Sequence, residues 1–370
     1  MTNSIVPFNS DKFPPLRVAL IVNSATPGGA ESYLYRLYEG LAKRGLVKVT
    51  LIGQLPDWPI ELGPTIPAGT AAKLTRREPI LPQLKNSLSN ALAVRRVLKL
   101  QSFDLIHMQY FREKLILPGF FTRDLPVLWT EHGPLPPNFP RIGLPFLRMR
   151  ARRAAIIAVS EAVSESLKEV NIRSEVVWNP LPESASGRFI RRTGGESDYL
   201  LYAGRVHSSK RLSLLLDAAR LTPDLNVKIA GDGPDLEELR KSAPPNVDFL
   251  GHLSDLEDLM AGCLAVVSTS GRKAREGSPM VVLEARNLGV PVLMAEDCHA
   301  AGEARDLGAV IYAPTPESLA SQLRELGRHV RNTPLNSLSR ERRSEARWLT
   351  DTYDVMQRTV HPARHAGSEI

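Results

Sequence analysis

Residues 16–53 read LRVALIVNSATPGGAESYLYRLYEGLAKRGLVKVTLIG, and this stretch decides the fold class. Its first seven residues form the apolar run expected of a strand buried in a parallel sheet. A glycine-rich turn follows, and residues 31–45 have the amphipathic spacing of a helix that ends at Gly45. VKVTLIG, at 47–53, is a second strand. The stretch therefore predicts a strand–helix–strand unit with a right-handed crossover.

The alternation of strands and helices continues along the chain, except at residues 179–198, where Pro, Gly and Arg interrupt it. A chain of 370 residues favours two domains. We predict an α/β protein whose two Rossmann-like parallel-sheet domains face each other across a cleft. The expected parts are a leader at 1–15, domains at 16–180 and 181–345, a helix at 346–360 that packs back on the first domain, and a tail at 361–370.

Composition excludes several classes of protein. The longest apolar runs fall short of a membrane span, and the first fifteen residues lack the apolar core of a signal peptide. Cys263 and Cys298 are the only cysteines, so we expect a reducing cytoplasm, no disulfide framework and no Cys/His zinc site.

Charge is distributed unevenly along the chain. The first 180 residues carry 23 Lys and Arg against 14 Asp and Glu, whereas the remainder carries 24 against 26. This asymmetry favours an anionic partner for the N-terminal half, such as phospholipid, a phosphorylated acceptor or nucleic acid, with a basic solvated surface as the alternative. Nucleic acid is the weakest of these interpretations because the basic half has no aromatic-rich basic motif.

Two loops of the second domain carry the chemistry. In AGRVHSSKR, Arg205 and Lys210 lie between a strand end and the next helix, where cations and a helix N-terminus suit a diphosphate. In REGSPMVVLEARNLG, Glu276 precedes a helix that begins near Pro279, and Glu284 lies inside it. Carboxylates accept hydrogen bonds from paired sugar or ribose hydroxyls. The alternatives are solvated cations and an ion pair between Glu284 and Arg286 or Arg205.

The turn NSATPGGAES places Gly28 and Gly29 between the first strand and its helix. The full G-x-G-x-x-G fingerprint is absent, which argues against a dinucleotide-dependent dehydrogenase. We expect these glycines to let a ligand approach the backbone at the helix N-terminus. His132, in TEHGP, directly follows another strand and is predicted to face the ligand. Glu131 and His107 are predicted to be structural.

The order of these segments, GG-A-E, H-G, AGR with a later Lys, IAGDGP, FLGHL and then E-x7-E, resembles retaining glycosyltransferases of family 4, which have the GT-B fold. The resemblance runs from about residue 16 to about residue 353 and is weakest between 54 and 88. It implies an acceptor-binding first domain, a second domain that binds a nucleotide-sugar donor, and transfer of a sugar with retained anomeric configuration. UDP is the favoured nucleotide, with GDP close behind.

The resemblance also implies roles for individual residues. Arg205 and Lys210 would bind the diphosphate, Glu276 would lie at the transferred sugar, Glu284 would take the ribose hydroxyls, and His132 would act near the reaction centre. The Val281 and Val282 N–H groups would point toward the diphosphate, and the base would pack at Gly251 and His252. The full set of further donor-binding positions is Gly29, Gly204, Gly251, His252, Gly277, Ser278, Pro279, Met280, Val281 and Val282.

No cofactor is implied because the nucleotide sugar is a substrate, and no D-x-D pair is placed for a metal, so transfer is predicted to be metal-independent. The sequence departs from the family pattern at Ser278, which often is aromatic, and in the basic residues Arg272, Lys273 and Arg275. The basic stretch PFLRMRARRAA could place the protein peripherally at the inner membrane face, or simply pack on the sheet. A nucleotide-sugar epimerase or hydrolase and a non-catalytic nucleotide-sugar-binding protein are the rival interpretations.

Overall fold

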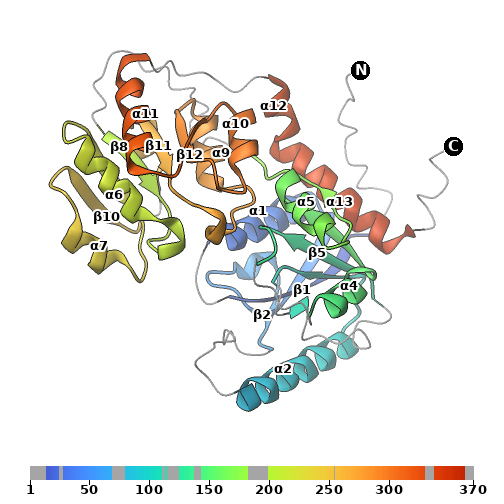
Figure 1. The fold of residues 1–370 in the computed structure, drawn as a ribbon. Coiled ribbons are helices and arrows are strands. Elements are labelled where there is room, and N and C mark those ends of the chain that lie inside the picture. Colours follow the sequence, from blue (N-terminus) through green and yellow to red (C-terminus); the bar gives the residue numbers. More distant parts are fainter. Residues whose placement is uncertain are drawn as a thin grey trace.

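The computed structural model of the protein describes residues 14–24, 28–68, 80–110, 113–114, 125–136, 143–181, 199–253, 255–329 and 337–362. These residues form two parallel sheets with helices packed around them (Figure 1). Residues 1–13 of the predicted leader, residues 182–198 of the interdomain stretch and residues 363–370 of the tail lie outside the described residues.

The first sheet has seven strands in the order β3-β2-β1-β4-β5-β6-β7. Each pair of neighbours is parallel, as the apolar run at 16–22 predicts. The strands are β1 (Leu16–Asn23), β2 (Val47–Gln54), β3 (Thr65–Ile66), β4 (Leu105–Met108), β5 (Val127–Glu131), β6 (Ala154–Ala158) and β7 (Glu175–Val176). The accompanying helices are α1 (Gly29–Lys43), α2 (Ile80–Leu100), α4 (Leu144–Ala151) and α5 (Glu161–Glu169). The longest of these helices is α2, with 21 residues.

The second sheet has six parallel strands in the order β10-β9-β8-β11-β12-β13. They are β8 (Tyr199–Ala203), β9 (Asn226–Ala230), β10 (Val247–Gly251), β11 (Ala265–Ser268), β12 (Val292–Ala295) and β13 (Val310–Tyr312). The helices are α6 (Leu212–Leu221), α7 (Leu236–Ser242), α8 (Glu257–Ala261), α9 (Met280–Asn287), α10 (Ala301–Asp306) and α11 (Pro316–His329).

The last two described helices return toward the first sheet. They are α12 (Ser337–Arg342) and α13 (Glu345–Val360), and α13 contacts α1, β4, β5 and β6 (Figure 1). The inner face of α13 is apolar, and Trp348, Leu349, Val355 and Met356 join the core of the first sheet. Burial of each of these side chains stabilises the folded protein by about 1.5–3 kcal/mol, which is why α13 packs against the first sheet and not the second.

Candidate active site

Each sheet has one point at which the strand order reverses, and three of the predicted site loops begin there. The reversal lies between β1 and β4 in the first sheet and between β8 and β11 in the second. Loops that leave neighbouring strands diverge at such a point and open a crevice at the carboxyl ends. Gly29 follows β1, Arg205 and Lys210 follow β8, and Glu276 follows β11, while His132 follows β5.

Lys210 and Glu276, which the sequence assigned to the same site, form an ion pair. Their side chains are only 21% and 15% exposed. Burial is the main reason that the pKa of Lys210 is lowered to about 8; the charge of Cys298 raises it and that of Arg205 lowers it. Lys210 is therefore protonated at neutral pH. In the ligand-free protein its ammonium group is paired with the Glu276 carboxylate.

Arg211 fastens the loop that carries Lys210. Its Nε donates to Thr269 O at 2.9 Å, and its two terminal nitrogens bind the Asp297 carboxylate at 2.9 and 2.7 Å. Thr269 Oγ1 in turn donates to Lys210 O at 2.6 Å. The sequence analysis missed Arg211 and Asp297, and their separation of 86 residues leaves no local signal that pairs them.

The loops His132–Gly133 and Arg275–Gly277 pack against each other across the two sheets. A Cβ atom on Gly277 would meet Val163 Cγ2 and lie 2.7 Å from His132 O, and a Cβ on Gly133 would meet Arg275 O. Real Cβ atoms do not approach oxygen this closely, so only glycine fits either place. The predicted His and Glu loops are thus in direct backbone contact.

Hydrogen bonds from the first domain hold the same loop. Ser160 Oγ donates to Gly277 O at 2.7 Å, and Asn179 Nδ2 donates to Ser278 O at 3.1 Å. Arg275, one of the basic residues that depart from the family pattern, donates from Nε to Pro134 O at 2.7 Å. The basic residue before Glu276 therefore joins the two domains.

The N-termini of α1 and α9 face each other at the site. A Cβ atom on Gly29 would lie 3.9 Å from Met280 Cγ. Pro279 is the N-cap of α9 and provides no side-chain cap, so the first amides of that helix are available to an anion. Val282 departs from the prediction, because its N–H donates to Pro279 O at 3.0 Å and not toward the cleft.

Glu284 lies half-buried on α9. Burial raises the pKa of its carboxyl group, and the charge of Arg36 on α1 acts in the opposite direction. Arg286, one of the two predicted ion-pair partners, donates to Leu307 O at 2.6 Å and to Val290 O at 3.2 Å. A half-buried carboxylate beside a helix N-terminus is suited to accept hydrogen bonds from ligand hydroxyls.

His132 is half-buried, with its ring edge-on to Tyr33 at a centroid distance of 4.8 Å. Its Nε2 atom is buried and has no hydrogen-bond partner among the described residues. Burial, with a contribution from Lys114, lowers the pKa of His132 to about 3. The imidazole is therefore neutral at physiological pH and can offer a hydrogen bond but not a charge.

A buried polar layer lies beneath His132. Lys114 is fully buried and its Nζ contacts Glu131 Oε1 at 2.6 Å and Gln109 O at 2.8 Å. His107 is also fully buried, 2.7 Å from Tyr38 Oη and 2.8 Å from Thr130 Oγ1. These contacts agree with the structural roles predicted for Glu131 and His107, and they fix the end of β5.

Four other predicted donor residues make none of the hydrogen bonds or ion pairs described above. Gly251 and His252 lie at the carboxyl end of β10, the edge strand, and His252 is exposed. Gly204 and Arg205 are exposed beside the Lys210 loop. Within the ranges given above, no group of three metal-ligating side chains is found, and Cys263 and Cys298 are buried free thiols.

Comparison with known families settles the class. The family Glycosyltransferase Family 4 matches residues 27–184, and the family Glycosyl transferases group 1 matches residues 186–330. The chain belongs to the family 4, group 1 glycosyltransferases. It is a retaining glycosyltransferase of the hexosyltransferase class with the GT-B fold, and it uses a nucleotide-sugar donor.

Solved structures share the fold of this glycosyltransferase. A glycosyltransferase from Rickettsia africae ESF-5 is 14% identical with a TM-score of 0.73, over 94% of this chain and 99% of that one. Anabaena HepE in complex with UDP-glucose is 20% identical with a TM-score of 0.65, over 95% and 100%. WaaG, described as a glycosyltransferase of lipopolysaccharide biosynthesis, is 16% identical with a TM-score of 0.59, over 95% and 100%. A sequence comparison with curated proteins gave no match.

Proposed function

We propose that the protein transfers a hexose from a UDP-sugar to an acceptor hydroxyl, without a metal ion. The observation that carries this proposal is the Lys210–Glu276 ion pair at the N-terminus of α9, opposite Gly29 and the His132 loop. A cation, a carboxylate and two helix N-termini there match a diphosphate and the sugar attached to it. The complex of Anabaena HepE with UDP-glucose, which shares the fold, supports UDP.

In this mechanism the diphosphate displaces Glu276 from Lys210, and the freed carboxylate turns to the sugar hydroxyls. Lys210 and Arg205 then stabilise the charge that develops on the leaving phosphate, an effect worth several kcal/mol in a dry cleft. The leaving phosphate accepts the proton of the acceptor hydroxyl on the face it vacates. His132, being neutral, holds a sugar hydroxyl near the reacting carbon.

The donor proposal is tested by calorimetry with UDP, GDP and ADP in the presence of a chelator. We expect UDP to bind, and Glu284→Ala to weaken binding by about tenfold, the loss of one hydrogen bond to a charged group. 2′-Deoxy-UDP should bind the wild type as weakly as UDP binds the variant. Glu238→Gln, an exposed change on α7, is the control. Equal binding of UDP by all three proteins contradicts the assignment of Glu284.

A second test follows UDP release from UDP-glucose with a panel of acceptors. Release that rises with one acceptor supports transfer, whereas release without any acceptor at the same rate favours the hydrolase interpretation.

Anionic phospholipid vesicles belong in the panel because α4 exposes Phe146 (40%) and Met149 (53%) beside the exposed Arg152 and Arg153. Within the described residues, no helix has the length and apolar character to cross a bilayer. The cytoplasmic location and the anionic acceptor remain predictions.

The pH dependence of UDP binding reports on Lys210. Its pKa of about 8 lies below the ordinary value for lysine, so the ammonium loses its proton as pH rises through 8. A bound diphosphate stabilises the protonated form. Affinity should therefore be complete below about pH 8 and fall by up to about tenfold per pH unit above it. Calorimetry from about pH 7 to about pH 9 should show this slope in the wild type and lose it in Lys210→Met; an equal slope in both contradicts the assignment.

A further inference from the structure

The connection between α12 and α13 contacts both halves of the site, and we call residues 343–348 the clasp. Arg343 is buried and places Nη2 2.7 Å from Glu303 Oε1. Its guanidinium also stacks over the Trp178 ring at 4.4 Å, and its main-chain O accepts from Leu181 N at 2.8 Å. The clasp thus holds α10 and the segment that leaves the first sheet.

One arm of the clasp, formed by Arg343, reaches the Ser278 loop through Glu303. Glu303 Oε1, which pairs with Arg343, also accepts a hydrogen bond from Ser278 Oγ at 2.9 Å. Ser278 is buried and the side chain of Glu303 is only 6% exposed. Burial raises the pKa of Glu303, and the charge of Arg343 opposes the rise. Since Ser278 precedes the N-cap of α9, the Arg343–Glu303 pair sets where that helix begins.

The other arm reaches the histidine loop. Trp348 is fully buried and meets the Tyr33 ring edge-on at 5.0 Å, and Tyr33 meets His132 in the same way at 4.8 Å. Arg36 secures this arm, donating to Glu345 Oε2 at 2.8 Å and lying 5.9 Å over the Trp348 ring. Arg343 is therefore linked to Ser278 through Glu303, and Trp348, five positions later, is linked to His132 through Tyr33.

We propose that the clasp positions the Ser278 loop and His132 relative to each other, with Arg343 and Trp348 as positioning residues for the transfer step. This inference rests on the proposed function, because it assigns the two loops to one reaction. Neither side chain touches the proposed substrates. Their effect comes from alignment, since displacement of a reacting group by about 1 Å can cost about 100-fold in rate.

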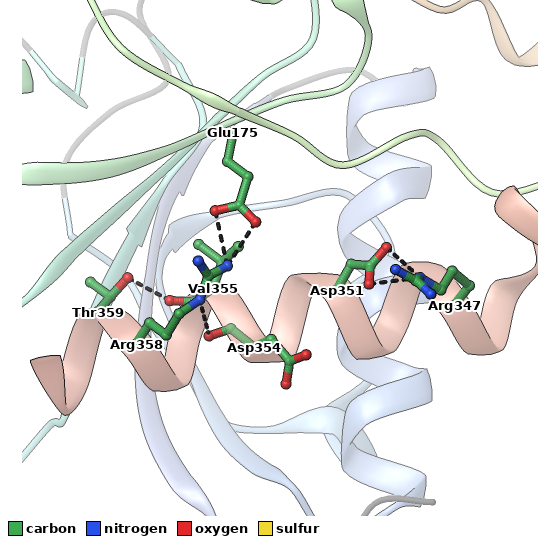
Figure 2. Close-up of polar contacts among 7 residues, drawn as sticks. All are labelled: Glu175, Arg347, Asp351, Asp354, Val355, Arg358 and Thr359. Atoms are coloured by element: carbon green, nitrogen blue, oxygen red, sulfur yellow. Dashed lines mark hydrogen bonds and ion pairs between the residues drawn. The ribbon is translucent and has the colours of Figure 1, made fainter. Parts of the chain in front are cut away.

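The outer face of α13 offers matched controls. Arg358 pairs with Glu175 and Arg347 pairs with Asp351 (Figure 2). The closest nitrogen–oxygen distances are 2.7 Å and 2.9 Å, respectively. These side chains are between 32% and 48% exposed. Arg358→Gln removes a positive charge from α13, the helix that carries Trp348.

The test compares Arg343→Gln, Arg343→Gln with Glu303→Gln, Trp348→Leu and Arg358→Gln. Tm, UDP affinity, UDP release from UDP-glucose with water as acceptor, and hydrogen–deuterium exchange are measured for each. Arg343→Gln leaves Glu303 buried without its charge partner and should lower Tm, and the double variant should regain Tm because the carboxylate is gone. The shorter glutamine pair cannot span the same gap, so the release rate should stay about tenfold low and residues 275–284 should exchange faster.

Trp348→Leu should lower the release rate by about tenfold with UDP affinity within about twofold, and should speed exchange at 130–134. If this variant does not fold, Trp348→Phe carries the same expectation at a smaller size. Arg358→Gln should change none of these quantities. The proposal is overturned if the release rate of the double variant recovers with its Tm, or if Trp348 variants keep the wild-type rate.

Failure of the proposed function gives a different pattern. A wild type that neither binds UDP nor releases it from UDP-glucose contradicts the donor assignment, whatever the variants do. Hydrogen exchange then still decides the clasp, because it reports the two loops without a substrate. Unchanged exchange at both 275–284 and 130–134 in the folded variants overturns the clasp alone.

Discussion

Lys210→Met is expected to lower the rate of UDP release from UDP-glucose by about 100- to 1000-fold, the range found when one preorganised charge-stabilising donor is removed. Lys210 is the mostly buried cation that Glu276 holds at the site, and no other described side chain forms an ion pair with that carboxylate. In the proposed mechanism, removal of the ammonium leaves the phosphate with only one of its two cations, Arg205. Steady-state kinetics with saturating donor measure the effect.

Two comparisons make this result specific. Lys241→Met removes an equal charge from the exposed end of α7 and should leave the rate unchanged. Lys210→Met with Glu276→Gln removes the carboxylate that would otherwise repel the diphosphate, so UDP affinity should partly return while the release rate stays low. A rate near wild type in Lys210→Met contradicts the role of this lysine.

The second large effect is expected at the backbone contact between the two loops. Gly277→Val places a branched side chain against Val163 Cγ2 and 2.7 Å from His132 O. Overpacking of this kind costs about 1–3 kcal/mol, and here the strain falls on the contact that aligns the site. We expect kcat/KM for donor turnover to fall by about 100-fold. We also expect Tm to fall, because the overpacking destabilises the folded protein.

Gly302→Ala is the matched control for that substitution. A Cβ on Gly302 meets nothing within 4 Å, and alanine in helix α10 should leave turnover unchanged and raise Tm slightly. If Gly277→Val turns over donor like the wild type, the two loops need not touch for catalysis. The measurement is donor turnover beside thermal unfolding for both variants.

Much of the fold followed from local pattern. The apolar run at 16–22 and its glycine-ended helix predicted β1 and α1, and the repeated alternation predicted two parallel sheets, because strand and helix periodicity are local properties of the chain. Helix α2 follows the same local rule, because Leu81, Leu84 and Leu88 in its first half have the spacing of one helix face. The last helix was visible as a helix, but its contacts were not.

The site divides in the same way. Sequence alone selected Lys210, Glu276, Glu284, Gly29 and His132, because strand ends and helix starts mark ligand-facing positions without knowledge of distant contacts. It missed Arg211 with Asp297 and Arg343 with Glu303, whose side chains lie far apart in sequence.

For this protein, then, the sequence by itself determined the fold class, the family resemblance and the residue types of the site. Only the tertiary structure decided which of these residues meet. It paired Lys210 with Glu276, engaged the Val282 N–H within its own helix turn, and brought α13 back to the first sheet. The physical reason is that periodicity and turn chemistry act over a few residues, whereas pairing depends on the packing of whole sheets.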